Sequence, residues 1–148
     1  MARTRRRGRQ QDGLTDLLVL DADGVSKAAS LDPSVQAWLE RARELDADVA
    51  VSAVTVAEVV RGVARDARVN RMLKAADVRP AEEPLARRAG RLLGRARSDA
   101  TIDALVAATA LAALEGKGAQ GRCVLLTSDP KDLGALLTGE PRIRVIAV

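Results

Sequence analysis

The sequence has no histidine, tyrosine or phenylalanine, and it has one cysteine and one tryptophan among 148 residues. Without histidine, the chain cannot form a Ser-His-Asp triad, a histidine general base or a zinc site with a histidine ligand. One cysteine cannot form an internal disulfide or a Cys₄ zinc site. An enzyme made from this chain must therefore use carboxylates, Lys, Arg and Ser/Thr, and we expect a metal ion to assist them.

Other absences narrow the environment and the partners. Because Trp38 is the only aromatic residue, a platform of several stacked bases is excluded, and any nucleic acid would be held mainly by its phosphates. No apolar run approaches the roughly 18 residues that span a bilayer, so we expect no membrane segment. The basic N-terminus is not followed by the apolar stretch of a secretory signal. Together with the single Cys123, in an expected buried strand, this predicts a reduced, cytoplasmic location.

The positive charge is concentrated at one end. The chain has a net charge of +4, and residues 1–13 contain five arginines and one aspartate. We therefore expect a disordered basic arm over residues 1–13 and one domain over residues 14–148. The arm is either an attractant for nucleic acid or an incidental start without a role.

Short apolar runs alternate with stretches of helical periodicity along the rest of the chain. We expect strands over residues 17–20, 49–51, 78–80, 124–127 and 143–148. We expect helices over residues 33–45, 55–64, 67–75, 83–97, 99–114 and 131–137. This alternation predicts an α/β fold with a central parallel sheet flanked by helices.

Four acids each lie where an apolar run meets the start of a helix: Asp21, Glu58, Asp103 and Asp129. Ligands bind outside the carboxyl ends of the strands in an open parallel sheet, so these four side chains are expected to converge. Clustered carboxylates repel one another unless a cation holds them, and Mg²⁺ prefers oxygen ligands. The pattern therefore predicts an acidic, metal-binding pocket.

Each acid also has a purely structural interpretation. Asp21 suits a turn or cap, Glu58 completes a capping box that begins at Thr55, and Asp129 before Pro130 is a typical helix start.

Three further residues are secondary candidates. Asp99 lies four residues before Asp103, which would put both carboxylates on one face of the same helix. Asp23 is either a ligand or a solvated loop residue. Ser128 either donates a hydrogen bond to a ligand or shapes its turn.

Four segments, in this order, resemble the PIN domain, and more narrowly the VapC-type toxins of bacterial toxin–antitoxin pairs. They are Leu-Val-Leu-Asp at 18–21, Ser-Ala-Val-Thr-Val-Ala-Glu-Val-Val-Arg-Gly at 52–62, Ile-Asp-Ala-Leu-Val-Ala-Ala-Thr-Ala at 102–110 and Leu-Thr-Ser-Asp-Pro-Lys-Asp-Leu at 126–133. Each motif is weak alone, whereas the ordered set, spanning about residues 17–148, is fairly specific.

This resemblance implies a PIN-like three-layer sandwich and a Mg²⁺- or Mn²⁺-dependent endoribonuclease. Asp21, Glu58, Asp103 and Asp129 would be its acidic quartet, with Asp99 as a helper. We expect Asp21, Asp103 and Asp129 to hold metal directly and Glu58 to orient metal or water. The family also implies an RNA substrate, a homodimer, and a cognate antitoxin whose tail enters the active site.

The sequence departs from the family pattern at Asp23, where a Ser, Thr or Asn is common, and in its Arg-rich arm. An extra acid at Asp23 bears on the number of metal ions and on the fit of the substrate.

Two other functions fit part of the pattern. Residues 19–25 resemble the strand-Asp-x-Asp-Gly signature of haloacid-dehalogenase-like phosphatases, with Asp21 as nucleophile and Asp23 as acid–base. Against this, Lys117 is a poor candidate for the expected lysine, and Glu58 and the 102–110 motif stay unexplained. The other alternative is a catalytically inactive PIN-like module that binds RNA or an antitoxin without cutting, and the departure at Asp23 motivates it.

Overall fold

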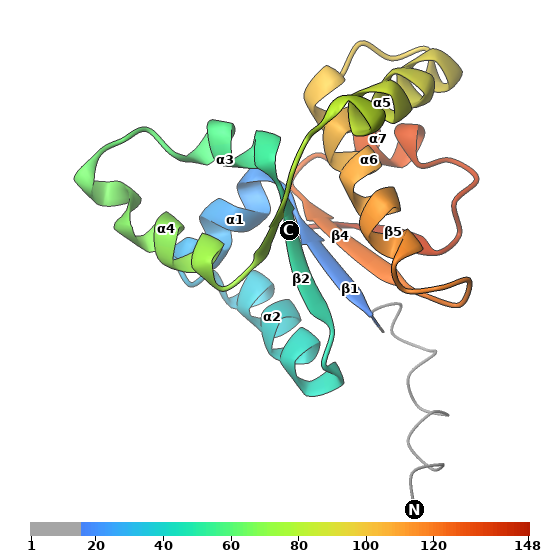
Figure 1. Ribbon diagram of the computed structural model, residues 1–148. Helices are drawn as coiled ribbons and strands as arrows, with labels where there is room; N and C mark the ends of the chain where they lie inside the picture. The colour runs from blue at the N-terminus through green and yellow to red at the C-terminus, as the bar shows by residue number, and fades with distance from the viewer. Residues whose placement is uncertain (1–15) are drawn as a thin grey trace, which may run out of the picture.

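The computed structural model describes residues 16–148, in which five parallel strands form one sheet with helices on both faces (Figure 1). The predicted basic arm, residues 1–13, lies outside the described residues. The strands are β1 Leu17–Leu20, β2 Asp48–Ser52, β3 Asp77–Arg79, β4 Cys123–Thr127 and β5 Ile143–Ala147. They lie in the order β3-β2-β1-β4-β5, and every neighbouring pair is parallel. The predicted α/β sandwich around a central parallel sheet is confirmed.

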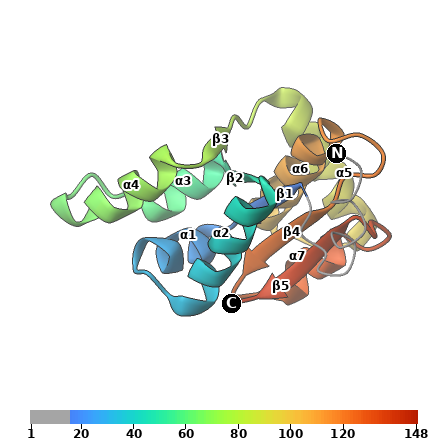
Figure 2. The ribbon, with the colours of Figure 1, turned by 90° about the horizontal axis from the view of Figure 1, so that it is seen from below.

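The helices form two layers (Figures 1 and 2). The chain segment before β3 contains α1 Ala22–Ala29, α2 Pro33–Leu45, α3 Ala53–Val59, the short 3₁₀ turn η1 Ala64–Asp66 and α4 Ala67–Lys74. The segment after β3 contains α5 Glu83–Ala96, α6 Thr101–Glu115 and α7 Pro130–Leu136. None of these helices, all within residues 16–148, is long and apolar enough to cross a membrane.

The central strand β1 contributes side chains to both hydrophobic cores. Successive side chains of a strand point to opposite faces of the sheet. Accordingly, Leu17 and Val19 pack into the core beneath α5, α6 and α7, whereas Leu18 and Leu20 pack into the core beneath α1 and α2. All four are buried, and fully burying one such side chain stabilises the fold by about 1.5–3 kcal/mol. A strand covered on both faces explains the uninterrupted apolar run in the sequence.

Helix α1 corrects the sequence prediction, which placed no helix between residues 20 and 33. Asp and Gly have low helix propensity, so Asp23 and Gly24 look like a turn. The Asp21 carboxylate accepts a hydrogen bond of 2.8 Å from the Gly24 N–H and caps the helix. A Cβ on Gly24 would lie 3.3 Å from the Leu126 carbonyl oxygen, so glycine lets α1 approach β4 closely. Tertiary packing therefore overrides local propensity here.

Helix α3 also differs from its prediction. It begins at Ala53, and the Ser52 hydroxyl caps it by accepting a hydrogen bond of 3.4 Å from the Val54 N–H. The capping box predicted from Thr55 to Glu58 is therefore wrong, because both residues lie inside the helix. The helix ends at Val59 rather than near residue 64.

The carboxylate of Asp66 shapes the connection from α3 to α4. It accepts hydrogen bonds of 2.8, 2.7 and 3.1 Å from the backbone N–H groups of Arg61, Gly62 and Val63. These hydrogen bonds favour the charged form and hold the pKa of Asp66 below its ordinary value of 3.8. Gly62 has a φ of 77°, which glycine adopts without strain. The acid therefore replaces the helical hydrogen bonds that α3 loses by ending early.

Two glycines provide a matched test of packing. Gly121 is buried, and a Cβ there would lie 2.7 Å from the Lys117 Cβ, whereas a Cβ on Gly90 of α5 meets nothing within 4 Å. We expect Gly121→Ala to lower the free energy of unfolding by about 1–3 kcal/mol. Gly90→Ala should raise it by about 0.5–1 kcal/mol, because alanine favours an exposed helix. Urea unfolding monitored by circular dichroism measures both, and equal stabilities would contradict this packing.

Candidate functional site

The strand order reverses between β1 and β4, and the candidate site lies at the carboxyl ends of these two strands. The chain passes from β1 outward to β2 and β3 on one side, and β4 and β5 follow on the other. Such a reversal leaves a crevice at the carboxyl edge, where ligands bind in open α/β sheets. Asp21 directly follows β1, and its backbone N–H donates to the Leu126 carbonyl oxygen of β4 at 3.2 Å. The two strand ends are thus tied together at the crevice.

Asp21 is buried and held by several hydrogen bonds. Burial raises the pKa of its carboxyl above the ordinary 3.8, and the negative charge of Asp23 raises it further. Hydrogen bonds from the Thr127 hydroxyl and the Gly24 N–H oppose this shift. The Thr127 hydroxyl also accepts a hydrogen bond of 3.0 Å from the Asp129 N–H. Thr127 therefore connects the Asp21 carboxylate to the turn that carries Asp129.

Glu58 and Asp103 reach the same region from α3 and α6. Partial burial raises the pKa of Glu58, and the charges of Asp21, Asp103 and Asp23 add to the shift. Partial burial likewise raises the pKa of Asp103, with contributions from the charges of Asp132, Asp21 and Asp129. Three elements far apart in the sequence therefore bring their acids within one another's electric field.

Asp129 caps α7 and also contributes negative charge to the site. Its carboxylate accepts a hydrogen bond of 3.3 Å from the Lys131 N–H, which is the structural role the sequence allowed for it. Of the neighbouring charges, Asp132 has the largest effect on Asp103, ahead of Asp21 and Asp129. Asp132 lies within α7, three residues after Asp129.

The secondary candidates have different positions. The Ser128 hydroxyl donates a hydrogen bond to the Asp23 carboxylate, which joins α1 to the β4–α7 turn. The prediction that Asp99 and Asp103 share a face of one helix is wrong, because α6 begins only at Thr101. Asp99 is exposed before that helix, and its charge is not among those that raise the pKa of Asp103.

The oxygen atoms of these acids suit a hard divalent cation, but the side chains do not lie close enough together to hold one. All the acids offer carboxylate oxygens, and their mutual repulsion is what a bound cation would relieve. Within residues 16–148, however, no three such side chains stand close enough together to hold one ion. The carboxylates therefore influence one another electrostatically without forming a metal site. Their side chains would have to rotate to bind a metal.

Three features of the site are not evident from sequence patterns. Thr127 looks like the last residue of a strand, and its hydrogen bonds to two different elements depend on the tertiary fold. Asp132 looks like an ordinary helix acid. The Thr55 hydroxyl, one turn before Glu58, is buried without a hydrogen-bond partner in the described part of the chain. An unsatisfied hydroxyl of this kind costs about 1–3 kcal/mol.

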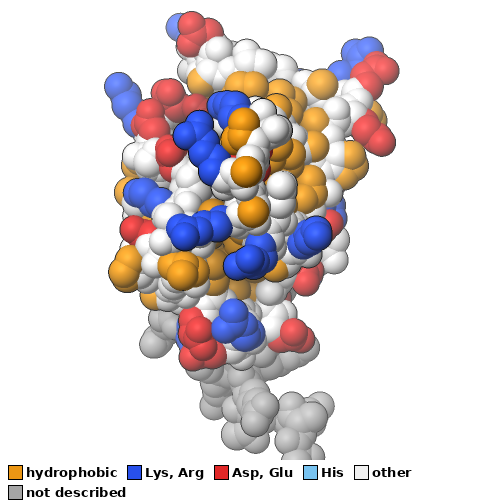
Figure 3. All heavy atoms as spheres, turned by 90° about the vertical axis from the view of Figure 1, so that its left-hand side faces the viewer, with side chains coloured by type: hydrophobic (Ala, Val, Ile, Leu, Met, Phe, Trp, Pro, Cys, Tyr) orange, Lys and Arg blue, Asp and Glu red, His pale blue; other side chains and the backbone are white. Residues whose placement is uncertain are grey.

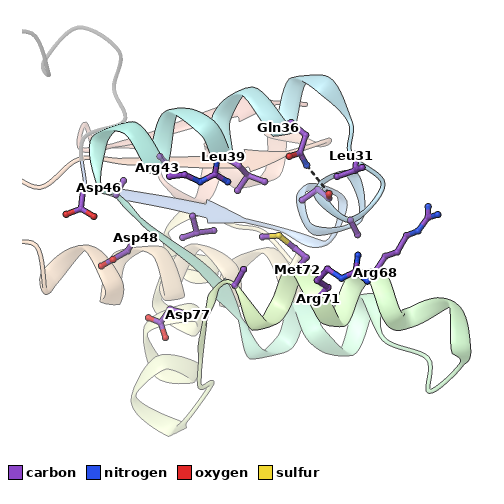
Figure 4. Close-up of a pocket in the computed structure, with 16 residues that line it drawn as sticks. Leu31, Gln36, Leu39, Arg43, Asp46, Asp48, Arg68, Arg71, Met72 and Asp77 are labelled. Carbon is purple, nitrogen blue, oxygen red and sulfur yellow. Dashed lines mark hydrogen bonds between the residues drawn. The ribbon is translucent and has the colours of Figure 1, made fainter.

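A separate apolar groove of about 860 Å³ lies between α2 and α4. Figure 3 shows this side of the molecule, with Lys and Arg side chains spread across its middle and hydrophobic side chains exposed among them. Leu39 and Met72 line the groove, Arg68 and Arg71 lie at one end, and Asp77 lies toward the other (Figure 4).

Leu31 at the edge of this groove is unusual in two ways. It has a φ of 61°, which costs a leucine about 1–2 kcal/mol, and its exposed fraction is 73%. The positive φ belongs to the C-terminal cap of α1, where the Asp32 N–H donates to the Lys27 carbonyl oxygen at 2.9 Å and the Leu31 N–H donates to the Ala28 carbonyl oxygen at 3.2 Å. The Leu31 side chain adds exposed apolar surface at the edge of the groove.

The family model described as PIN domain matches residues 18–131, which contain all four acids of the predicted quartet. Comparison with curated protein sequences finds no match.

Solved structures share the fold at low sequence identity. A chain of the VapBC2 complex from Rickettsia felis, solved with a promoter DNA fragment, has a TM-score of 0.66 at 16% identity, covering 89% of this chain and 98% of that one. A chain of a toxin–antitoxin complex from Klebsiella pneumoniae has a TM-score of 0.63 at 20% identity, covering 88% and 99%. A chain of FitAB bound to IR36 DNA has a TM-score of 0.60 at 22% identity, covering 88% and 94%.

The raised pKa values predict how an Asp103→Asn variant responds to pH. A carboxyl whose pKa is higher in the folded protein than in the unfolded chain loses stabilising free energy as the pH rises through that folded pKa. Asparagine cannot ionise, so the metal-free variant should unfold a few degrees higher than the wild type at pH 7. This rise corresponds to about 1 kcal/mol, after solvent screening, from the relieved cost of burying the charge and from relieved repulsion. The advantage should vanish below the ordinary pKa of 3.8.

Thermal unfolding in EDTA between pH 3.5 and 8 measures this difference. Asp99→Asn is the matched control and should show no such pH-dependent gain. A variant at Asp103 that is less stable than the wild type at pH 7 would contradict the repulsion.

Proposed function

The chain belongs to the PIN-domain family, and we propose that it is a metal-dependent endoribonuclease that acts as the toxin of a toxin–antitoxin pair. The observation that carries the proposal is that burial and the charges of neighbouring acids raise the pKa values of Asp21, Glu58 and Asp103, at the carboxyl edge where the strand order reverses. Cytoplasmic location and a homodimer, which the family resemblance implies, are part of the same proposal.

We assign Asp21, Asp103 and Asp129 as the residues that would hold Mg²⁺ or Mn²⁺, with Glu58 orienting metal or water. A bound metal supplies an activated water and stabilises charge on the scissile phosphate and the leaving oxygen. Hydrogen bonds from Gly24 and Thr127 keep the Asp21 carboxylate in place for this role. Glu58 is only partly buried and most of its surface is exposed, so its carboxylate can turn toward a water at the edge of the site.

Asp23 and Ser128 are proposed to position the site rather than to react. Their hydrogen bond joins the turns that carry Asp21 and Asp129, so it limits how far these two acids can move apart. Asp99 stays a proposed helper, acting from outside α6 at the edge of the site.

A binding module without cleavage is the second candidate. One observation favours it: the carboxylates of residues 16–148 do not already form a group that could hold a metal ion. A phosphatase of the haloacid-dehalogenase type receives no comparable support. It would use Asp23 as acid–base, and the hydroxyl of Ser128 already engages that carboxylate.

The groove between α2 and α4 supports the proposal of an antitoxin partner. The similar structures include chains from toxin–antitoxin complexes. An apolar floor with charged ends fits an amphipathic segment, because the floor buries its apolar face and the ends pair with its charges. Acidic residues of such a segment would lie near Arg68 and Arg71, and basic residues near Asp77.

Cleavage of a structured RNA pool by the purified protein tests the nuclease. We expect products with Mg²⁺ or Mn²⁺ and none in EDTA. Asp103→Asn should reduce the rate by about 100-fold or more, because it removes a proposed metal ligand. Asp46→Asn is the matched control: it changes the same group at the end of α2, where Asn tolerates the positive φ, and should leave the rate unchanged.

Two results would contradict the nuclease. Cutting that persists at full rate in EDTA or in Asp103→Asn would remove the acidic cluster from the chemistry. Metal-independent RNA binding without products, in protein free of antitoxin, would favour the binding module.

Co-purification with a candidate antitoxin tests the groove. Leu31→Asp should weaken the complex at least about tenfold, because it places a charge at the exposed apolar edge. The variant should fold, since Asp tolerates a positive φ better than Leu. Val63→Asp, at another exposed apolar residue outside the groove, is the control. Equal affinities for both variants would contradict docking in the groove.

A further inference from the structure

A cleft of about 370 Å³ lies between α5, the end of α6 and the turn before β5. Its charged residues are four arginines and two glutamates: Arg88, Arg91, Arg95, Arg142, Glu115 and Glu140. The first three arginines are spaced three and four residues apart along α5, so they lie on one side of the helix. The cleft belongs to the layer of helices opposite the groove described above.

The two glutamates of this cleft are already paired. Glu115 forms an ion pair with Arg88, and Glu140 forms one of 3.2 Å with Arg142. Arg91 and Arg95 are exposed, and neither has an ion-pair or hydrogen-bond partner among residues 16–148. The cleft therefore presents two positive charges that nothing in the described protein compensates.

The composition of the cleft favours a phosphate backbone over a protein segment. Only Leu92 and Leu111 contribute apolar lining, and Leu92 is itself buried, so the cleft lacks the apolar centre typical of protein interfaces. Guanidinium groups pair in fork geometry with phosphate oxygens. The single aromatic residue, Trp38, lies in α2 and packs against the other core, so base stacking cannot contribute in this cleft.

The cleft also has a defined position relative to the acidic cluster. A connection of four residues joins α5 to α6, and Arg88 near the start of α5 pairs with Glu115 at the end of α6, so the two helices are antiparallel. Asp103 lies in the first turn of α6, about 18 Å along the helix from Glu115. Arg95 lies in the last turn of α5, closer to the level of Asp103.

We propose that this cleft binds the phosphate backbone of an RNA strand that extends from the acidic cluster along α5, with Arg91 and Arg95 as its phosphate contacts. The proposal rests on the proposed nuclease function, since that function supplies the RNA. It assigns affinity for flanking nucleotides to a surface that takes no part in bond cleavage. This surface would make binding depend on the length of the RNA rather than on the sequence at the cleavage site.

Binding of a fluorescein-labelled 20-nucleotide uridine RNA to the full chain in EDTA tests the proposal without cleavage. Fluorescence anisotropy at 50–200 mM KCl gives the affinity and its salt dependence. Arg91→Gln/Arg95→Gln should weaken binding about 10- to 100-fold at 50 mM KCl. It should reduce the slope of log affinity against log salt by about 1.4, because each phosphate contact on a single strand contributes about 0.7.

Lys27→Gln/Lys74→Gln is the matched control. It removes the same charge from the last turns of α1 and α4, in the other layer of the sandwich. All variants keep residues 1–15, so the charge of that segment contributes equally. We expect the control to keep the wild-type slope within error, and unchanged thermal unfolding shows that both variants are folded.

Several outcomes would overturn the proposal. The first is that the wild type does not bind RNA, and the second is that all three proteins have equal salt slopes. The third is an equal reduction of the slope in both variants, which would show an effect of net charge only. Loss of binding to labelled polyglutamate with an unchanged RNA slope would assign the cleft to an acidic protein instead. Failure of the nuclease proposal can be told apart from failure of this one. Asp103→Asn should bind RNA with the wild-type salt slope. If Arg91→Gln/Arg95→Gln reduces the slope but the wild type cleaves no RNA, the cleft is still an RNA-binding site and only the nuclease proposal fails.

Discussion

The burial of carboxylates at the carboxyl edge of the sheet, together with the repulsion between them, is the constraint that the surrounding fold must balance. Asp21 and Asp103 would be more stable apart or protonated, and burial raises the pKa of both. The two hydrophobic cores on either side of β1 provide the opposing free energy, since each fully buried side chain contributes about 1.5–3 kcal/mol. The hydrogen bonds of Thr127 then fix the direction of the Asp21 carboxylate. Acidic side chains whose pKa values are raised by burial and by one another's charge are typical of a functional site.

The parts of this site that follow from the sequence are those encoded by local patterns. β1 and β4 are short apolar runs, and the acids after them fall at the carboxyl edge because all the strands are parallel. Helix α1 could not be predicted this way. Its Gly24 lowers helix propensity locally but is needed for close approach to β4, which only the tertiary fold reveals.

The sequence also does not show which neighbouring acid raises the pKa of Asp103 most. Asp132 affects Asp103 more than Asp129 does, although Asp129 has the better sequence context after a strand. Asp99 has the right spacing from Asp103 for a shared helix face, but α6 starts two residues after Asp99. Spacing along the chain predicts proximity only when both residues lie within the same element, so the boundary of α6 decides that case.

The two layers of helices present surfaces of different chemistry on either side of one acidic edge. The α2–α4 groove has an apolar floor with charged ends and the exposed Leu31 at its edge, which suits an amphipathic segment of a partner. The α5 cleft is mostly charged and carries two arginines without partners among the described residues, which suits a polyanion. In the proposed function, inhibition and substrate binding would therefore use opposite sides of the sheet and could change independently by mutation.

Anomalous diffraction from crystals soaked in Mn²⁺ tests most directly whether the carboxylates at the strand reversal form a metal site. We expect an anomalous peak at the carboxyl ends of β1 and β4, with oxygen ligands from Asp21, Asp103 and Asp129 at about 2.0–2.4 Å. The peak should be absent from crystals of Asp103→Asn. A fully soaked wild-type crystal with no peak at this edge, or with its only peaks elsewhere, would contradict the claim.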